Sequence, residues 1–97
     1  MDPVAERVFE FALRAYHNGD VETAVEYFSK SLNIEATNWQ CRFYLAMSYY
    51  RSARVSEAAN EFASISDLCP DRDLRAKASA FVSNLHSTVS QGYGKSA

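Results

Sequence analysis

Helix-breaking residues are scarce in this chain. Among 97 residues, glycine occurs only at positions 19, 92 and 94, and proline only at positions 3 and 70. Because glycine and proline are the residues that most often interrupt regular structure, most of the chain is free to be helical. This scarcity favours an all-α domain.

Long apolar runs and a strong net charge are also missing. No apolar run approaches the roughly 20 residues that a membrane helix needs. The chain has ten basic and twelve acidic residues, for a formal net charge of -2. It therefore has no excess of positive charge that would attract nucleic acid. The opening residues Met1-Asp2-Pro3 lack the basic-then-apolar layout of a secretory signal. We therefore expect no nucleic-acid partner, no membrane insertion and a cytoplasmic location.

Residues for catalysis or metal binding are few. The two cysteines, Cys41 and Cys69, form no CxxC motif, and too few histidines accompany them for a zinc site. We interpret them as reduced thiols, with a disulfide between them as the alternative. His17 and His86 are isolated, and no GxGxxG, Walker, HExxH or GxSxG motif is present. We predict no catalytic residue, no metal site and no cofactor, so that the protein is not an enzyme.

What the chain does contain is an internal repeat. Six residues recur 34 positions later, as the pairs Phe9/Phe43, Ala12/Ala46, Tyr16/Tyr50, Val21/Val55, Ala24/Ala58 and Phe28/Phe62. A fixed period of about 34 residues indicates a stacked helix-turn-helix array. Such arrays offer a curved face that holds another polypeptide.

Capping and breaking signals divide the chain into about five helices. The first three helices are expected at Pro3 to Asn18, Val21 to Ile34 and about Asn38 to Ser52. The fourth is expected to be capped by Ser56 and to end before Cys69-Pro70. The fifth is expected to be capped by Asp71 or Asp73 and to reach about Val89. Residues 91–97 are polar and contain two glycines. We expect them to form a flexible tail.

The repeated residues resemble the tetratricopeptide repeat. That family has a small residue where the first helix of a repeat crosses the second, and Ala12 and Ala46 occupy this position. It also has an alanine in the second helix followed four residues later by a large aromatic residue, as in Ala24-Phe28 and Ala58-Phe62. Asn18-Gly19-Asp20 matches the family's turn, whereas Ala53-Arg54 replaces it in the second copy. The resemblance implies a right-handed superhelical stack of antiparallel helix pairs. One domain would span 1–90, with repeat one at 5–38, repeat two at 39–72 and a capping helix at 73–90.

The last helix fits the 34-residue period poorly. A strict extrapolation would bury Ala76, Ser79, Ala80 and Ser83, whereas the visible apolar stripe is Leu74, Ala78, Phe81, Val82, Leu85 and Val89. The stripe has helical spacing. We therefore expect an insertion of two residues after Pro70, with the stripe covering the end of the second repeat.

Two stripes are expected on each first helix of a pair. At about 100° per residue, Val8, Phe11, Ala12 and Ala15 face the second helix, and a second stripe lies roughly 115° away. In the tetratricopeptide family this second stripe lines a concave groove. The predicted partner-binding residues are Phe9, Leu13, Tyr16, Phe43, Met47 and Tyr50. Leu13 and Met47 stand where the family often has asparagine, so the predicted groove is unusually apolar.

These observations predict a protein–protein interaction module. As an adaptor or scaffold, it would bind an apolar helix or peptide in its concave groove. One alternative is a self-assembling unit that forms a homodimer through the same apolar face. A second is a small chaperone for a secreted subunit, and a third is that the chain's own core fills the groove.

Overall fold

The protein is a stack of helices. The computed structural model describes the backbone of residues 2–96 and the side chains of residues 2–85. Within this part of the chain the secondary structure is entirely helical, which confirms the predicted all-α class and its five helices. They are α1 (Pro3–His17), α2 (Val21–Ile34), α3 (Trp39–Arg51), α4 (Val55–Leu68) and α5 (Arg72–Ser96).

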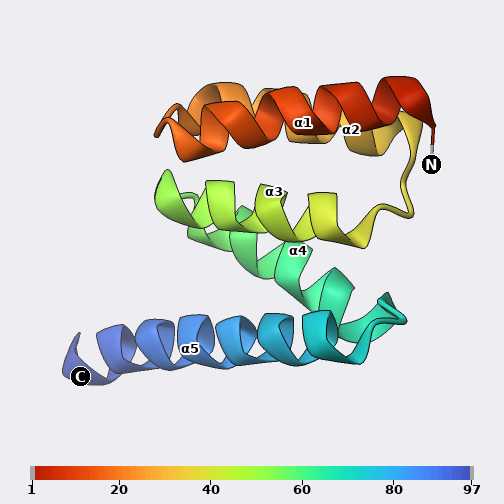
Figure 1. Ribbon diagram of the computed structural model, residues 1–97. Coiled ribbons are helices and arrows are strands. Elements are labelled where there is room, and N and C mark those ends of the chain that lie inside the picture. Colours follow the sequence, from red (N-terminus) through yellow and green to blue (C-terminus); the bar gives the residue numbers. More distant parts are fainter. Residues whose placement is uncertain (1, 97) are drawn as a thin grey trace.

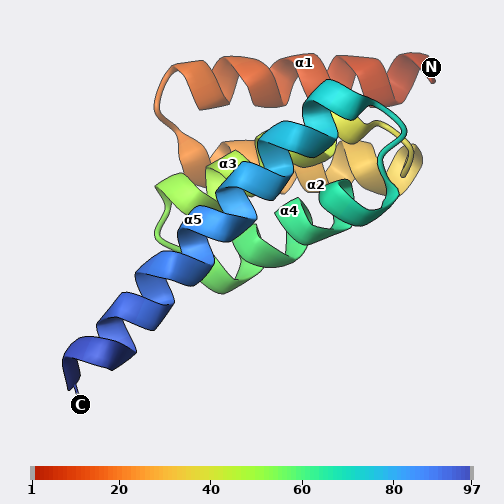
Figure 2. The same ribbon diagram turned by 90° about the horizontal axis from the view of Figure 1, so that it is seen from below.

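The helices pack mainly on their neighbours in sequence (Figure 1). The helices α1 and α2 form one antiparallel pair, α3 and α4 form the next, and α5 lies against α4. The view in Figure 2 shows α5 crossing the stack, with its C-terminal part projecting beyond the other helices. This arrangement agrees with a helical repeat-like fold.

Acidic and amide side chains cap four of the five helices. The Asp2 carboxylate accepts hydrogen bonds from the backbone nitrogens of the first turn of α1, and Asp20, Asn38 and Asp71 do the same for α2, α3 and α5. The predicted Ser56 cap of α4 is wrong. This helix begins at Val55, and its N-cap residue Arg54 makes no side-chain cap bond. Arg54 instead pairs with Glu57 at 3.0 Å, which satisfies the side chain but leaves the helix end uncapped.

The two turns within the helix pairs use the same left-handed backbone with different residues. Gly19 has φ 84° and Ala53 has φ 65°. Left-handed backbone costs an L-residue about 1–2 kcal/mol because its Cβ crowds the following carbonyl, whereas glycine adopts it freely. The backbone is therefore strained at Ala53 in the second turn, whereas Gly19 adopts the same conformation in the first turn without strain.

A reciprocal exchange at these turns tests this assignment. We expect Ala53→Gly to raise the free energy of unfolding by about 0.5–1 kcal/mol, and Gly19→Ala to lower it by a similar amount. No atom lies within 4 Å of a Cβ built at Gly19, so backbone strain alone sets the second effect. Urea unfolding with an unchanged slope would measure both. A loss of stability in Ala53→Gly would contradict the explanation.

Small and large residues alternate in the core as predicted. Ala12, Ala24 and Phe28 are fully buried in the first core cluster, between α1, α2 and α3. Ala46, Ala58 and Phe62 repeat this arrangement in the second cluster, between α3, α4 and α5. The alanines let helix backbones approach, and the phenylalanines fill the space beside them. The 34-residue period in the sequence is therefore a packing period.

Polar bonds also join the helices inside the core. The buried Ser31 hydroxyl donates to the carbonyl of Ala5 at 2.8 Å, which connects α2 to α1. The Cys41 thiol donates to the carbonyl of Phe28 at 3.4 Å, which connects α3 to α2. Cys41 and Cys69 are both free and buried, so the prediction of reduced thiols is confirmed and the disulfide alternative is wrong.

The apolar stripe of α5 packs as the two-residue insertion requires. Ala78 and Leu85 are buried, and Leu74, Phe81 and Val82 are half-buried against the second core cluster. The residues that a strict period would bury, Ala76, Ser79, Ala80 and Ser83, are exposed. Burial of the stripe saves more free energy than an unbroken 34-residue period would.

The predicted end of this helix is wrong. The helix α5 does not stop near Val89 but continues to Ser96, through the two glycines. Glycine inside a helix costs only about 1 kcal/mol relative to alanine, so glycines without a proline do not fix a helix end. The predicted packing of Val89 and the predicted flexibility of residues 91–97 concern side chains beyond residue 85, where the description of side chains ends.

The predicted contact stripe of α1 packs on α2, but unevenly. Phe11 meets Tyr27 of α2 edge to face at 4.6 Å, yet 46% of it is exposed. Val8 is half-exposed, whereas Ala12 and Ala15 are buried. The close approach that the alanines permit places the α1–α2 contact on the small residues. The larger Phe11 is therefore displaced to the outer edge of this contact.

Candidate functional site

A hollow opens where α1, α3 and α5 face one another. Its volume is about 180 Å³, and α3 supplies most of its lining. We refer to this hollow as the inner groove. Its lining residues are Tyr16 from α1, Gln40, Phe43, Tyr44 and Met47 from α3, and Leu74 and Lys77 from α5.

Three of the six predicted binding residues meet in the inner groove. Tyr16, Phe43 and Met47 line it, and all three are half-buried. They come from two different helix pairs, so the stacking of the pairs is what brings them together. The helical spacing of Phe43 and Met47 places both on the same face of α3.

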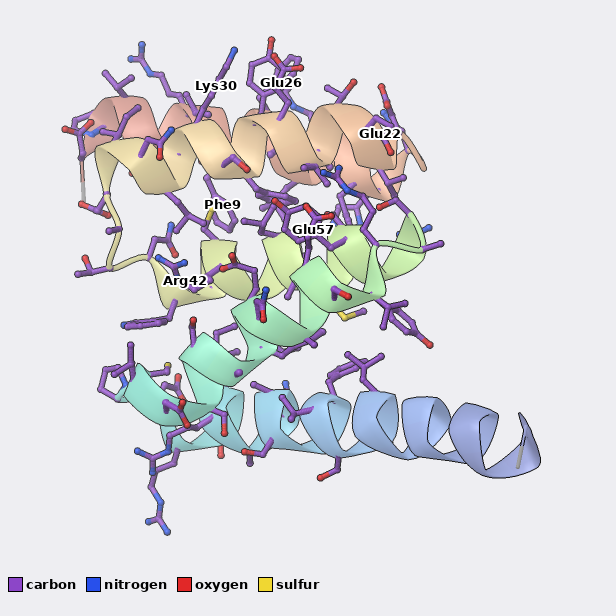
Figure 3. The ribbon with its side chains drawn as sticks, turned by 180° about the vertical axis from the view of Figure 1, so that it is seen from behind. Phe9, Glu22, Glu26, Lys30, Arg42 and Glu57 are labelled. Carbon is purple, nitrogen blue, oxygen red and sulfur yellow. The ribbon has the colours of Figure 1, made fainter. Side chains whose placement is uncertain are left out.

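Phe9, Leu13 and Tyr50 do not line the inner groove. Phe9 is only 9% exposed and packs on Phe28 and Tyr44, with ring centroids 5.8 and 6.2 Å away (Figure 3). Leu13 is half-buried against the first core cluster. Tyr50 is 46% exposed and its ring lies 6.3 Å from that of Phe81.

Four lining residues were not among the predicted binding residues. Gln40 and Tyr44 precede Met47 by seven and three residues, so they share its helix face, and this spacing could have identified them. Leu74 and Lys77 come from α5, and they lie 34 residues after Gln40 and Phe43, which also line the groove. A strict 34-residue comparison could therefore have identified both.

Aromatic contacts hold the α1 side of the inner groove in place. The rings of Tyr16 and Tyr44 meet edge to face at 5.5 Å, and Tyr44 stacks on the buried Phe28 at 5.9 Å. The Arg51 guanidinium lies 4.8 Å from the Tyr16 ring. Such contacts each contribute about 0.5–1.5 kcal/mol beyond area burial. This wall is therefore largely preformed.

A second aromatic group supports the α5 side. Phe81 stacks on Phe62 with ring centroids 4.6 Å apart, and Phe43 meets both rings edge to face at 5.5 and 6.0 Å. Phe43 thus connects the lining of the inner groove to the core beneath it. Its position depends on α5 staying docked.

The helices that line the inner groove also carry one cysteine and one histidine, Cys41 on α3 and His17 on α1. Burial raises the pKa of the Cys41 thiol to about 11, so at neutral pH it is protonated and a poor nucleophile. His17 is exposed on the solvent side of Tyr16. Among the side chains that the structure describes, no three metal-binding residues cluster, and no described helix is long and apolar enough to cross a membrane.

The inner groove thus presents apolar and aromatic side chains with Gln40 and Lys77 at its rim. No protein-family model matches the chain, and no curated protein matches it either.

Proposed function

We propose that this protein is a protein–protein interaction module of the tetratricopeptide type, an adaptor or scaffold that binds an apolar helix or peptide in the inner groove. The observation that carries the proposal is the lining of the groove. Five of its seven lining residues, Tyr16, Phe43, Tyr44, Met47 and Leu74, are aromatic or apolar, and they come from three separate helices.

The chemistry of the lining supports an apolar ligand. Tyrosine rings pack against apolar groups while their hydroxyls remain available at the rim. The flexible Met47 adapts to side chains of different shape. The site lacks a row of amide side chains for gripping an extended backbone, since Gln40 is the one amide in its lining. A helix, whose backbone hydrogen bonds are already satisfied, suits such a surface best.

Self-association through the inner groove and a chaperone role for a secreted subunit are the competing proposals. Each would use the same apolar lining, and no separate observation favours either of them. Self-association differs from the adaptor proposal because it needs a second copy of the chain and no added peptide, so peptide binding to the monomer distinguishes these two.

A displayed peptide library tests the groove directly. We expect selection from random peptides of about 16 residues to enrich sequences with apolar residues at helical spacing, with dissociation constants near 1–10 µM, or about -7 to -8 kcal/mol. Met47→Asp should weaken the enriched peptides about 10-fold to 100-fold, because it places a carboxylate against the apolar face of the ligand. Isothermal titration calorimetry gives both values.

The matched control is Leu68→Asp, which places the same carboxylate at a position 69% exposed near the end of α4. Its peptide affinity should equal that of the unmodified protein, and circular dichroism should show both variants folded. If Met47→Asp bound the enriched peptides as well as Leu68→Asp does, the inner groove would not be the binding site.

A further inference from the structure

The charges of this protein are divided between its helices. The helices α3 and α5 supply six of the seven lining residues of the inner groove. Residues 39–51 and 72–85 of these helices contain five basic residues and one acidic residue, a net charge of +4. The helices α2 and α4, which do not contribute to the lining, contain five acidic residues and one basic residue, a net charge of -4. The inner groove is therefore lined mainly by basic helices, although the net charge of the chain is negative.

Two of these basic side chains stand at the inner groove. Lys77 belongs to its lining, and the Arg51 guanidinium lies 4.8 Å from the ring of Tyr16, which also belongs to the lining. Both basic side chains are exposed, and no ion pair joins either of them to another described residue. Arg42, by contrast, pairs with Glu61 at 3.0 Å. The charges of Lys77 and Arg51 are therefore available to a ligand.

Among the described residues, the lining of the inner groove includes no acidic side chain. On α1, Glu6 and Glu10 lie about 80° and about 120° from Tyr16 around the helix. The helix α3 contains no acidic residue. On α5, Asp73 precedes Lys77 by one turn, but the two side chains form no ion pair. A ligand in the groove thus meets positive charge without a compensating carboxylate from the lining.

We propose that the inner groove binds an acidic amphipathic helix of another protein, whose carboxylates pair with Lys77 and Arg51. This assignment rests on the proposed function, because it names the class of helix that the same groove binds. The apolar face of the ligand packs on Phe43, Tyr44 and Met47. The two ion pairs lie at the edge of this contact, where complementary charges speed association and select the correct ligand.

The geometry of α3 sets the spacing of the two carboxylates. Arg51 follows Phe43 by eight residues, or about 12 Å along the helix axis, and Lys77 lines the same hollow as Phe43. Two residues seven positions apart in a ligand helix lie about 10.5 Å apart on one face. Met47 is midway between Phe43 and Arg51. We therefore expect apolar residues at the third and fourth positions after the first carboxylate, and the second carboxylate at the seventh.

A second copy of this chain does not offer such a helix. Its acidic helices are α2 and α4, and four of their five carboxylates already form ion pairs within the chain, with Asp67 as the exception. The apolar residues of both helices are also packed in their own core clusters. We therefore assign the acidic helix to a different protein.

Selection and charge reversal together test the assignment. Peptides enriched from the displayed library should carry aspartate or glutamate at two positions seven residues apart, on the face that carries their apolar residues. In about 50 mM salt, Lys77→Glu should weaken the binding of these peptides about 3-fold to 10-fold, and Arg51→Gln about 2-fold to 5-fold. Both losses should shrink in about 500 mM salt, which screens exposed charges. Isothermal titration calorimetry measures the affinities.

The matched control is Arg7→Glu, which reverses a charge on the side of α1 opposite Tyr16 and should leave the peptide affinity unchanged. A reciprocal change in the peptide gives a gain of binding. Of the two peptides in which one acidic residue is replaced by lysine, one should bind Lys77→Glu more tightly than it binds the unmodified protein. A folding defect cannot produce this gain.

Different results mark a failure of the acidic-helix assignment and a failure of the proposed function. Enriched peptides that lack acidic residues, and whose affinity depends on Met47 but not on Lys77, would overturn the assignment and leave the proposed function intact. The absence of any enriched peptide, or an unchanged affinity in Met47→Asp, would overturn both. A dimer that forms without peptide and is weakened by Lys77→Glu would also overturn both, because a second copy would then occupy the groove.

Discussion

Phe62→Ala is expected to lower the free energy of unfolding by about 3–5 kcal/mol. Phe62 is fully buried, stacks on Phe81 at 4.6 Å and meets Phe43 at 5.5 Å. Its removal leaves a cavity at the point where α3, α4 and α5 meet. Because a small domain often has only about 5–15 kcal/mol in total, we expect a large fall in the urea midpoint.

The same variant should loosen α5 before the rest of the protein unfolds. Hydrogen exchange in α5 is expected to rise more than exchange in α1 and α2, since Phe81 loses its stacking partner. Phe62→Leu keeps most of the volume and should lose clearly less stability. Equal stability of Phe62→Ala and the unmodified protein would mean that α5 is not held by this ring stack.

Phe28→Ala is expected to cost a similar 3–5 kcal/mol, with a different second consequence. Phe28 is fully buried, and its ring contacts Phe9, Tyr16 and Tyr44. Tyr16 and Tyr44 also line the inner groove. The variant should therefore weaken peptide binding even under conditions in which it remains folded, because one wall of the groove loses its support.

A matched control for this variant is Phe11→Ala. It removes the same side chain from a position that is 46% exposed, so the loss of stability should be well below that of Phe28→Ala. Thermal unfolding and calorimetry with one enriched peptide measure both properties. Unchanged peptide affinity in folded Phe28→Ala would show that the tyrosine wall holds its shape without the buried ring.

Repetition in the sequence predicts the core of this protein better than its surfaces. The pairs Ala24/Ala58 and Phe28/Phe62 occupy equivalent buried positions, because close packing of a small residue beside a large one tolerates little variation. The acidic caps Asp2 and Asp20 were also predictable, and Asp71 was one of two candidates for the cap of α5. The Ser56 cap failed because α4 begins one residue earlier, at Val55, directly after the turn that contains the left-handed Ala53, and a capping pattern does not show where such a turn ends.

The candidate site was only partly predictable for a related reason. A helical wheel gives the direction of Phe9 around α1, but Tyr44 from the next pair covers it, and no wheel contains that neighbour. Lys77 enters the lining from α5, 34 residues after Phe43, although the apolar stripe of this helix is shifted by two residues. The single-helix pattern identified Tyr16, Phe43 and Met47. The cover that Tyr44 provides over Phe9 required the positions of the helices in space.

The pairing of each helix with its neighbour in sequence also bears on how quickly the chain reaches this structure. The contacts of α1 are made with α2 and, to a small extent, α3, whereas α5 contacts α4 and the edge of α3. Each pair of neighbouring helices is joined by a short turn, so bringing the two helices into contact costs little loop-closure entropy. Helical proteins of low contact order typically fold within microseconds to milliseconds. The newly made chain would thus spend little time with its aromatic residues accessible to aggregation.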